Sequence, residues 1–260
     1  MTTPEPRVGP TLTEGGRRYL ELLQRCLTRE LFLDQDEPDL DPTIRAEGRD
    51  WPATADTMIG QVRLDHVLWC ARTVIEEGVP GDLVECGIWR GGVVALFRAV
   101  LAAYDDTDRS VWGADSFAGL PVPDTTRYPA DEGYDWSGVD ALKVGADEVR
   151  ANLARYGLLD DRVRLLEGWF EHTLPKAPID ALAVLRVDGD LYQSTMDVLT
   201  ALEPKVSPGG FVIIDDYNGW EPCRKAVDDY RAGSGITAPM TSVDWMAVWW
   251  RKGESDSLDQ

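Results

Sequence analysis

Four carboxylates stand in two close pairs, each directly after a run of apolar residues. The first pair, Asp188 and Asp190, follows residues 183–187, and the second pair, Asp215 and Asp216, follows a similar run. Such runs predict strands buried on both faces, and ligands bind beyond the carboxyl ends of such strands. At roughly 4 Å, two like charges cost about 1 kcal/mol in water and about 4 kcal/mol at an effective dielectric near 20. A hard divalent cation removes that cost, so the pairs predict a site for Mg²⁺ or Ca²⁺.

The first predicted strand–helix turn carries three glycines and one acid. Gly87, Gly91 and Gly92 let a backbone approach a ligand, next to a helix N-terminus with free N–H groups. Their spacing does not match the G-x-G-x-x-G dinucleotide pattern. Glu85 would repel a pyrophosphate but suits a cationic amino acid or a sulfonium. Glycines at a turn between a strand and a helix have a purely structural role about as often as they bind a ligand.

The next two strand tips add a second acid and an aromatic ring. Asp115, followed by Ser116, is placed to accept both hydroxyls of a ribose, although a turn-forming Asp is the alternative. Trp169, after Gly168, is placed to cover an adenine, although an aromatic ring there often packs in a core. Together the three tips fit a nucleoside without phosphates, and S-adenosylmethionine is the obvious candidate.

Histidine is too scarce to supply the general base. His66 and His172 are the two histidines of the chain, and we expect both to be structural. The base would then be a carboxylate or a lysine. The sequence contains no Ser-His-Asp arrangement, no G-x-S-x-G and no phosphate-cradling G-K-[ST].

Composition limits the partners. The 260 residues are 43% hydrophobic and 28% charged, with a formal net charge of -20. That charge argues against nucleic acid and against an anionic membrane surface. The simplest explanation of this net charge is that it keeps the protein soluble, and binding of a cationic partner is the alternative. The four cysteines lack C-x-x-C spacing and predict reduced core residues. Residues 1–10 lack a secretory pattern, and no apolar run approaches about 18 residues, so we expect a cytoplasmic protein.

Strands and helices alternate after an N-terminal helical region. Residues 1–16 are expected to be disordered, 17–80 to form a helical cap and acceptor or dimer region, 81–252 the core, and 253–260 an acidic tail. The cap holds helices at 17–33 and 60–77, separated by an aperiodic stretch. The expected core strands are 83–86, 111–114, 163–166, 183–187, 211–214, 236–240 and 245–251. The expected core helices are 93–104, 146–156, 195–202 and 222–231. Because the last two strands have no helix between them, we predict an α/β fold with a mainly parallel seven-stranded sheet and an antiparallel edge hairpin.

From Trp51 to about Lys252 the chain resembles the macrocin O-methyltransferase (TylF-type) family of antibiotic-sugar methyltransferases. Six ordered motifs carry the resemblance: TMIG at 57–60, DLVECGIWRGG at 82–92, ADSFAGLP at 114–121, GWF at 168–170, RVDGDLY at 186–192 and IDDY at 214–217. Cys86 stands where the family usually has Thr. The resemblance implies a class I methyltransferase fold and Mg²⁺-dependent methyl transfer from S-adenosylmethionine to a deoxysugar hydroxyl of a glycosylated natural product. A homo-oligomer is also expected.

Site roles follow from the resemblance by position. Asp188, Asp215 and Asp216 correspond to metal ligands, and Asp190 corresponds to the base that takes the sugar hydroxyl proton. The implied cofactor-binding residues are Met58, Glu85, Gly87, Arg90, Gly91, Gly92, Asp115, Ser116, Gly168, Trp169 and Asp188. The implied acceptor-facing residues are Met58, Tyr134 and Tyr192. Further aromatics, among them Trp136, Trp220 and Trp245, suggest a flat or bulky aglycone near the pocket, although Trp residues also pack cores.

Three rival functions remain open at this point. A metal-dependent catechol-type O-methyltransferase acting on a small aromatic diol uses the same chemistry of adjacent hydroxyls. An NAD-dependent oxidoreductase is disfavoured by the missing G-x-G-x-x-G pattern and by the acidic site. A non-catalytic partner subunit is disfavoured by the intact set of four aspartates.

Overall fold

The computed structural model describes residues 10–36 and 39–254, in which a seven-stranded sheet runs in the order β3-β2-β1-β4-β5-β7-β6. The strands are β1 (Asp82–Cys86), β2 (Val111–Asp115), β3 (Val163–Glu167), β4 (Leu182–Val187), β5 (Val206–Ile214), β6 (Thr241–Ser242) and β7 (Val248–Arg251). Neighbours from β3 to β5 are parallel. β7 is antiparallel to both β5 and β6. The predicted fold class, including its antiparallel edge, is confirmed.

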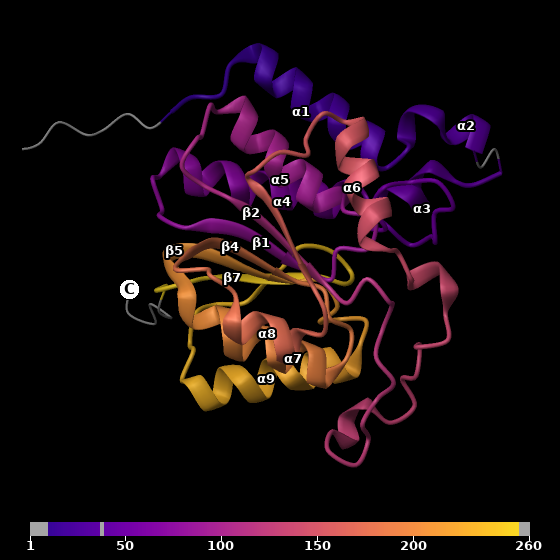
Figure 1. Ribbon diagram of the computed structural model, residues 1–260, viewed down its shortest axis with the longest axis vertical. Helices are drawn as coiled ribbons and strands as arrows, with labels where there is room; N and C mark the ends of the chain where they lie inside the picture. Colours follow the sequence, from indigo (N-terminus) through magenta and orange to yellow (C-terminus); the bar gives the residue numbers. More distant parts are fainter. Residues whose placement is uncertain (1–9, 37–38, 255–260) are drawn as a thin grey trace, which may run out of the picture.

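Helices cover both faces of this sheet (Figure 1). The α-helices are α1 (Glu14–Leu27), α2 (Leu33–Asp36), α3 (Pro42–Ala46), α4 (Gln61–Glu76), α5 (Gly92–Ala103), α6 (Ala146–Arg155), α7 (Phe170–Thr173), α8 (Tyr192–Leu202) and α9 (Glu221–Ser234). Short 3-10 turns lie at Glu30–Phe32, Pro129–Asp131, Asp140–Leu142, Leu174–Lys176 and Glu203–Lys205. In Figure 1, α1, α4, α5 and α6 lie above the sheet, and α7, α8 and α9 lie below it. The N-terminal helices therefore belong to the upper layer, where α4 packs directly on β4 and β5 and α1 packs on α5.

Each face of the sheet has its own apolar core because side chains alternate along a strand. Leu83 and Val184 point into the core shared with α1, α4 and α5. Val84 and Leu185, one position further along, point into the core shared with α8 and α9. This two-sided burial explains why the central strands read as continuous apolar runs.

The structure differs from the sequence prediction at several element ends. The first helix begins at Glu14, because the side chain of Thr13 accepts a hydrogen bond from Gly16 N at 3.0 Å and caps it. It stops at Leu27, and Arg29 then adopts a left-handed φ of 61°. The predicted disorder of residues 1–16 is wrong for residues 14–16, which are helical. Residues 1–9, and residues 255–260 of the predicted tail at 253–260, lie outside the described residues.

The C-terminal strands also differ from the prediction. Residues 236–240 are not a strand, and β6 is only Thr241–Ser242. β5 begins at Val206, five residues before the strand predicted at 211–214, and the added stretch contains an irregularity of the β4–β5 register. The end of β7 supports this stretch, since Lys252 N donates to Gly210 O at 2.8 Å.

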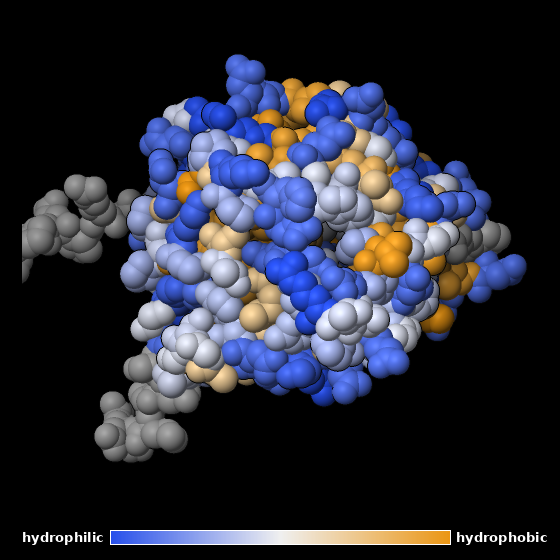
Figure 2. Space-filling model, turned by 60° about the horizontal axis from the view of Figure 1, so that its bottom comes forward, coloured by the Kyte–Doolittle hydropathy of each residue, from blue (hydrophilic) through white to orange (hydrophobic). Residues whose placement is uncertain are grey.

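The surface is mainly hydrophilic on the face seen in Figure 2, where apolar side chains form small separate patches. This agrees with the acidic composition of the chain. Among the helices within residues 10–36 and 39–254, none has the length and apolar character needed to cross a membrane.

Candidate active site

A cavity of about 520 Å³ opens at the carboxyl ends of the parallel strands. Four strands each contribute an acid to its lining, which are Glu85 on β1, Asp115 on β2, Asp188 after β4 and Asp215 after β5. The long connection between β2 and α6 passes this edge of the sheet (Figure 1) and supplies part of the wall. This is where an open α/β sheet binds its ligands.

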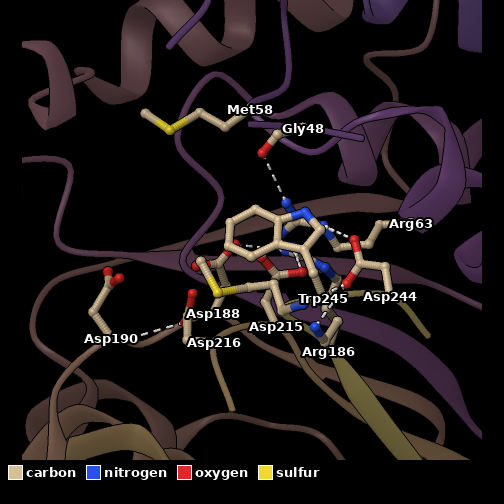
Figure 3. A network of polar contacts seen from close by, with 12 residues as sticks. Gly48, Met58, Arg63, Arg186, Asp188, Asp190, Asp215, Asp216, Asp244 and Trp245 are labelled. Atoms are coloured by element: carbon tan, nitrogen blue, oxygen red, sulfur yellow. Dashed lines mark hydrogen bonds and ion pairs between the residues drawn. The ribbon is translucent and has the colours of Figure 1, made fainter. Parts of the chain in front are cut away.

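The three aspartates with a predicted metal-binding role come together at the floor of this cavity. One carboxylate oxygen from each of Asp188, Asp215 and Asp216 lies within 4.8 Å of the other two. The register of the two strands brings this about, since Asp215 N donates to Val187 O at 2.8 Å. Asp190 joins the cluster through its backbone, whose N–H donates to Asp216 Oδ2 at 3.3 Å (Figure 3).

A buried arginine lies beneath the cluster and was not given a role from the sequence. Arg186 of β4 is 1% exposed. Its Nη1 lies 2.5 Å from Glu85 Oε1 and 2.9 Å from Asp188 Oδ2, and its Nη2 lies 2.6 Å from Asp215 Oδ1. Glu85 and Arg186 are register partners on β1 and β4. A charged residue within each apolar strand was the signal that could have predicted this pair.

A second arginine reaches the site from α4 and was also missed. Arg63 Nη1 lies 2.5 Å from Asp215 Oδ2, and its Nε lies 3.2 Å from Asp244 Oδ2. Its Nη2 donates to Gly48 O at 3.2 Å. Arg63 therefore joins the N-terminal region, the end of β5 and the β6–β7 connection at one point (Figure 3). No pattern in α4 marks it, because a helical Arg is normally solvated.

Burial and the crowded negative charges set the proton affinities of the site. Burial, followed by repulsion from Asp188 and Asp215, raises the pKa of Asp190 to about 8. Burial also raises the pKa of Asp188 to about 6. Burial and repulsion from the neighbouring aspartates hold the pKa of Asp216 well above its usual value. Asp215 differs: although burial acts to raise its pKa, Arg186 and Arg63 outweigh it, and the pKa is lowered. Asp188, Asp190 and Asp216 thus hold a proton more tightly than an ordinary carboxylate does.

Glu85 and Gly87 line the cavity, as expected for the first turn, but both are also tied to the protein itself. Burial raises the pKa of Glu85 to about 8, against the opposing effect of Arg186. Gly87 has φ +87°, and a Cβ there would overlap the carbonyl oxygen of Asp188. Gly87 is therefore required for the close approach of the β1 and β4 ends.

Ile88 and Trp89 of the first turn also line the cavity, whereas Arg90, Gly91 and Gly92 are not among its lining residues. Arg90 Nη1 donates to Ala55 O at 2.8 Å. A Cβ at Gly92 would lie 2.6 Å from Asp56 O. Arg90 and Gly92 thus hold the first turn against residues 52–57, and the prediction that they contact the cofactor gains no support from the geometry.

Asp115 and Ser116 line the cavity at the tip of β2. Asp115 Oδ2 accepts from Ile88 N at 2.8 Å, and its Oδ1 accepts from Phe117 N at 2.8 Å. The carboxylate is therefore fixed at the cavity edge, with each oxygen accepting from a backbone N–H group. Ser116 Oγ is used within its own turn, where it donates to Gly119 O at 2.7 Å.

Gly168 and Trp169 follow β3, and only the tryptophan lines the cavity. Trp169 is 40% exposed and belongs to the lining. Gly168 lies behind it, where its N–H donates to Asp115 O at 2.9 Å. The glycine therefore positions the ring by joining the β2 and β3 tips.

Of the three residues expected to face the acceptor, only one lines the cavity. Met58 lines the cavity. Tyr192 does not, because its hydroxyl is directed to Asp229 Oδ2 at 2.9 Å. Tyr134 does not either, and its ring packs behind the lining with its centroid 5.6 Å from that of Trp220. Contact of Tyr134 and Tyr192 with the acceptor therefore stays a prediction, which the lining of this cavity does not support.

Three features define the class of this protein. The sheet has an antiparallel β7, the first turn carries glycines, and an acid ends β2 at the same cavity. Together they are those of a class I S-adenosylmethionine-dependent methyltransferase. The family model of the macrocin-O-methyltransferases (TylF) matches residues 21–252, and the chain belongs to this family. It is therefore an O-methyltransferase that uses S-adenosylmethionine, and the resemblance noted in the sequence is confirmed.

Named relatives agree with this assignment. The chain is 50% identical to 8-demethyl-8-(2,3-dimethoxy-α-L-rhamnosyl)-tetracenomycin-C 4'-O-methyltransferase of Streptomyces olivaceus, over 92% of this chain and 95% of that protein. It is 43% identical to mycinamicin III 3''-O-methyltransferase of Micromonospora griseorubida, over 92% of this chain and 97% of that protein. The solved structure of the O-methyltransferase NovP is 47% identical, with a TM-score of 0.89 over 92% of this chain and 100% of that chain.

Proposed function

We propose that this enzyme methylates a deoxysugar hydroxyl of a glycosylated natural product, with Mg²⁺ at Asp188, Asp215 and Asp216 and with Asp190 as the general base. The names of its relatives support the acceptor class, since one specifies a rhamnosyl group. The observation that carries the proposal is the convergence of the three carboxylates within 4.8 Å beside Asp190.

The donor set of this cluster fits a hard divalent cation. It consists of carboxylate oxygens, the ligand type that Mg²⁺ and Ca²⁺ prefer. Around it, Arg63 and Arg186 supply two positive charges against a larger set of acids, namely Glu85, Asp188, Asp190, Asp215, Asp216 and Asp244. Asp215 is engaged by both arginines, so Asp188 and Asp216 have the freer oxygens. When bound, Mg²⁺ would offset the excess charge and acidify an acceptor hydroxyl beside it.

The remaining chemistry belongs to the side chains of this protein. S-adenosylmethionine supplies the methyl group as an electrophile. Asp190 takes the proton of the acceptor hydroxyl as the new O–CH₃ bond forms, and S-adenosylhomocysteine leaves. A carboxylate is a workable base here, because Mg²⁺ would acidify an acceptor hydroxyl beside it. The cavity positions both substrates, which supplies part of the barrier reduction.

Metal binding is tested directly, apart from turnover. We expect about one Mn²⁺ per chain by paramagnetic titration, and a more than tenfold weaker affinity in Asp188→Asn and Asp216→Asn. Both variants should keep their affinity for S-adenosylhomocysteine in calorimetry. Asp197→Asn, which removes a carboxylate elsewhere in the lining, is the matched control and should bind the metal normally. Unchanged Mn²⁺ affinity in all three variants, or full turnover in chelator, would refute the metal site.

The acceptor class is tested by comparing α-L-rhamnosides with 2,3-dihydroxynaphthalene as methyl acceptors. Methylation of the rhamnosides supports the proposal, whereas turnover of the aromatic diol alone favours the catechol-type alternative. A homo-oligomeric state and a cytoplasmic location stay predictions, which light scattering and cell fractionation would check.

A further inference from the structure

Three tryptophans from separate parts of the chain form one wall of the cavity. We call Trp51, Trp136 and Trp220 the tryptophan wall. The ring centroids of Trp51 and Trp136 lie 6.2 Å apart, and those of Trp136 and Trp220 lie 5.5 Å apart with a T-shaped arrangement. All three line the same cavity as the carboxylate cluster. The cavity therefore has an apolar side, formed by the tryptophan wall, and a charged side, formed by the carboxylate cluster.

Two rings of the wall keep much of their apolar surface in solvent. Trp51 is 54% exposed and Trp136 is 37% exposed. Covering such a ring is favourable, by roughly 25 cal/mol for each Å² of apolar surface removed from water. Large apolar side chains left exposed in a group mark a binding surface more often than isolated ones do.

The backbone around Trp51 is fixed, so its exposure is not a result of a loose segment. Three side chains from elsewhere in the fold donate to carbonyl groups on either side of it. Trp245 Nε1 donates to Glu47 O at 3.0 Å, Arg63 Nη2 to Gly48 O at 3.2 Å, and Arg90 Nη1 to Ala55 O at 2.8 Å. The segment is thus pre-organised with the ring facing the cavity, which lowers the entropic cost of binding.

We propose that the tryptophan wall is a subsite for a planar apolar aglycone, which determines which glycosides this enzyme accepts. This inference rests on the proposed function: the sugar lies at the carboxylates, and the group attached to it stacks on Trp51 and Trp136. Stacking on an aromatic ring favours a flat partner. The charged end of the cavity disfavours such a group, because desolvating the carboxylates would not be compensated there. The two ends therefore orient the acceptor in a single direction.

The test compares two glycosides that differ only in the aglycone. 2-Naphthyl α-L-rhamnoside and methyl α-L-rhamnoside are titrated calorimetrically into the enzyme saturated with S-adenosylhomocysteine and Mg²⁺. We expect the naphthyl glycoside to bind about tenfold more tightly. Trp51→Ala and Trp136→Ala should each weaken naphthyl glycoside binding about fivefold to tenfold, with less than a twofold effect on the methyl glycoside. Trp51→Phe and Trp136→Phe should restore most of the loss.

A matched control separates this role from packing. Trp69 is 45% exposed, similar to Trp51, and is not among the cavity residues. Trp69→Ala should leave both affinities unchanged. Equal affinity of the wild type for the two glycosides, or an equal loss for both in Trp51→Ala, would overturn the subsite while the sugar acceptor stands. Binding of neither glycoside by an enzyme that binds S-adenosylhomocysteine would overturn the proposed acceptor class and this inference with it.

Discussion

Arg63 of α4 donates a hydrogen bond of 2.5 Å to Asp215 at the end of β5, across 152 positions of sequence. The same guanidinium is paired with Asp244. Arg186 engages the other oxygen of Asp215. Asp215 is therefore held ionised between two arginines, while its neighbours Asp188 and Asp216 share the unbalanced charge. One helix that lies far from the strand tips in sequence thus fixes the geometry of the acidic floor.

Arg63→Ala should be strongly destabilising, because it leaves Asp215 and Asp244 as buried carboxylates with fewer partners. Removing one partner of a buried ion pair costs about 3–5 kcal/mol, and urea unfolding would measure the change in unfolding free energy. Lys225→Ala is the control, since the Lys225–Asp229 pair is 56% and 42% exposed, and such pairs contribute less than about 1 kcal/mol. Equal, small effects in both variants would show that Arg63 does not support the site.

Asp190→Asn should lower kcat by about 10²–10⁴-fold, the usual contribution of a general base. Asp190 has a left-handed φ of 55°, a conformation that Asn also tolerates, so the fold should be preserved. Single-turnover rates would measure the chemical step, with S-adenosylhomocysteine affinity and melting temperature as controls. A rate within threefold of the wild type would remove Asp190 from the mechanism.

Gly87→Ala should prevent folding or abolish S-adenosylhomocysteine binding, because a Cβ there would overlap the backbone of Asp188. Gly133→Ala is a closely matched control. Gly133 has φ +88°, nearly the same as Gly87, but nothing lies within 4 Å of the position that a Cβ would occupy there. The control should therefore cost only about 1–2 kcal/mol for the left-handed backbone. Soluble expression and thermal melts would measure both, and equal costs would contradict the close-approach argument.

His66 should make stability depend on pH. Burial lowers its pKa from 6.5 to about 4, and its ring packs against those of Trp69 and Trp249, which also contact each other. The unfolded chain therefore binds more protons between about pH 6.5 and 4, and the unfolding free energy falls as pH falls through that range. The loss from His66 should reach about 2 kcal/mol at pH 5.

His66→Phe isolates this contribution. Urea unfolding at pH 7.5 and pH 5 should show a smaller loss of stability in the variant than in the wild type, by about 2 kcal/mol. Other acids titrate in the same range in both proteins, so the difference between the two is the informative quantity. Parallel losses would mean that His66 is not held neutral by burial.

The sequence by itself determined the sheet and the position of the chemistry on it. Continuous apolar runs required strands buried on both faces, and the alternation with helices required parallel neighbours. Because the carboxyl ends of parallel strands meet at one edge, Asp188 and Asp215 could be expected to converge, and they do. Local pattern was less informative before residue 211, where pairing of Val206 with Leu182 and hydrogen bonds of Gly209 and Gly210 with Lys252 extend β5.

Tertiary structure alone decided what surrounds that chemistry. Arg63 and Trp51 reach the cavity from segments whose local sequence shows no sign of it, since long-range contacts depend on how layers pack and not on periodicity. The same packing directs Tyr192 to Asp229 and Arg90 to Ala55, although both belong to motifs shared with the family. The buried central strands are set by continuous apolar runs, which the sequence displays directly. The direction of a side chain is fixed by its neighbours in space, which only the folded chain defines.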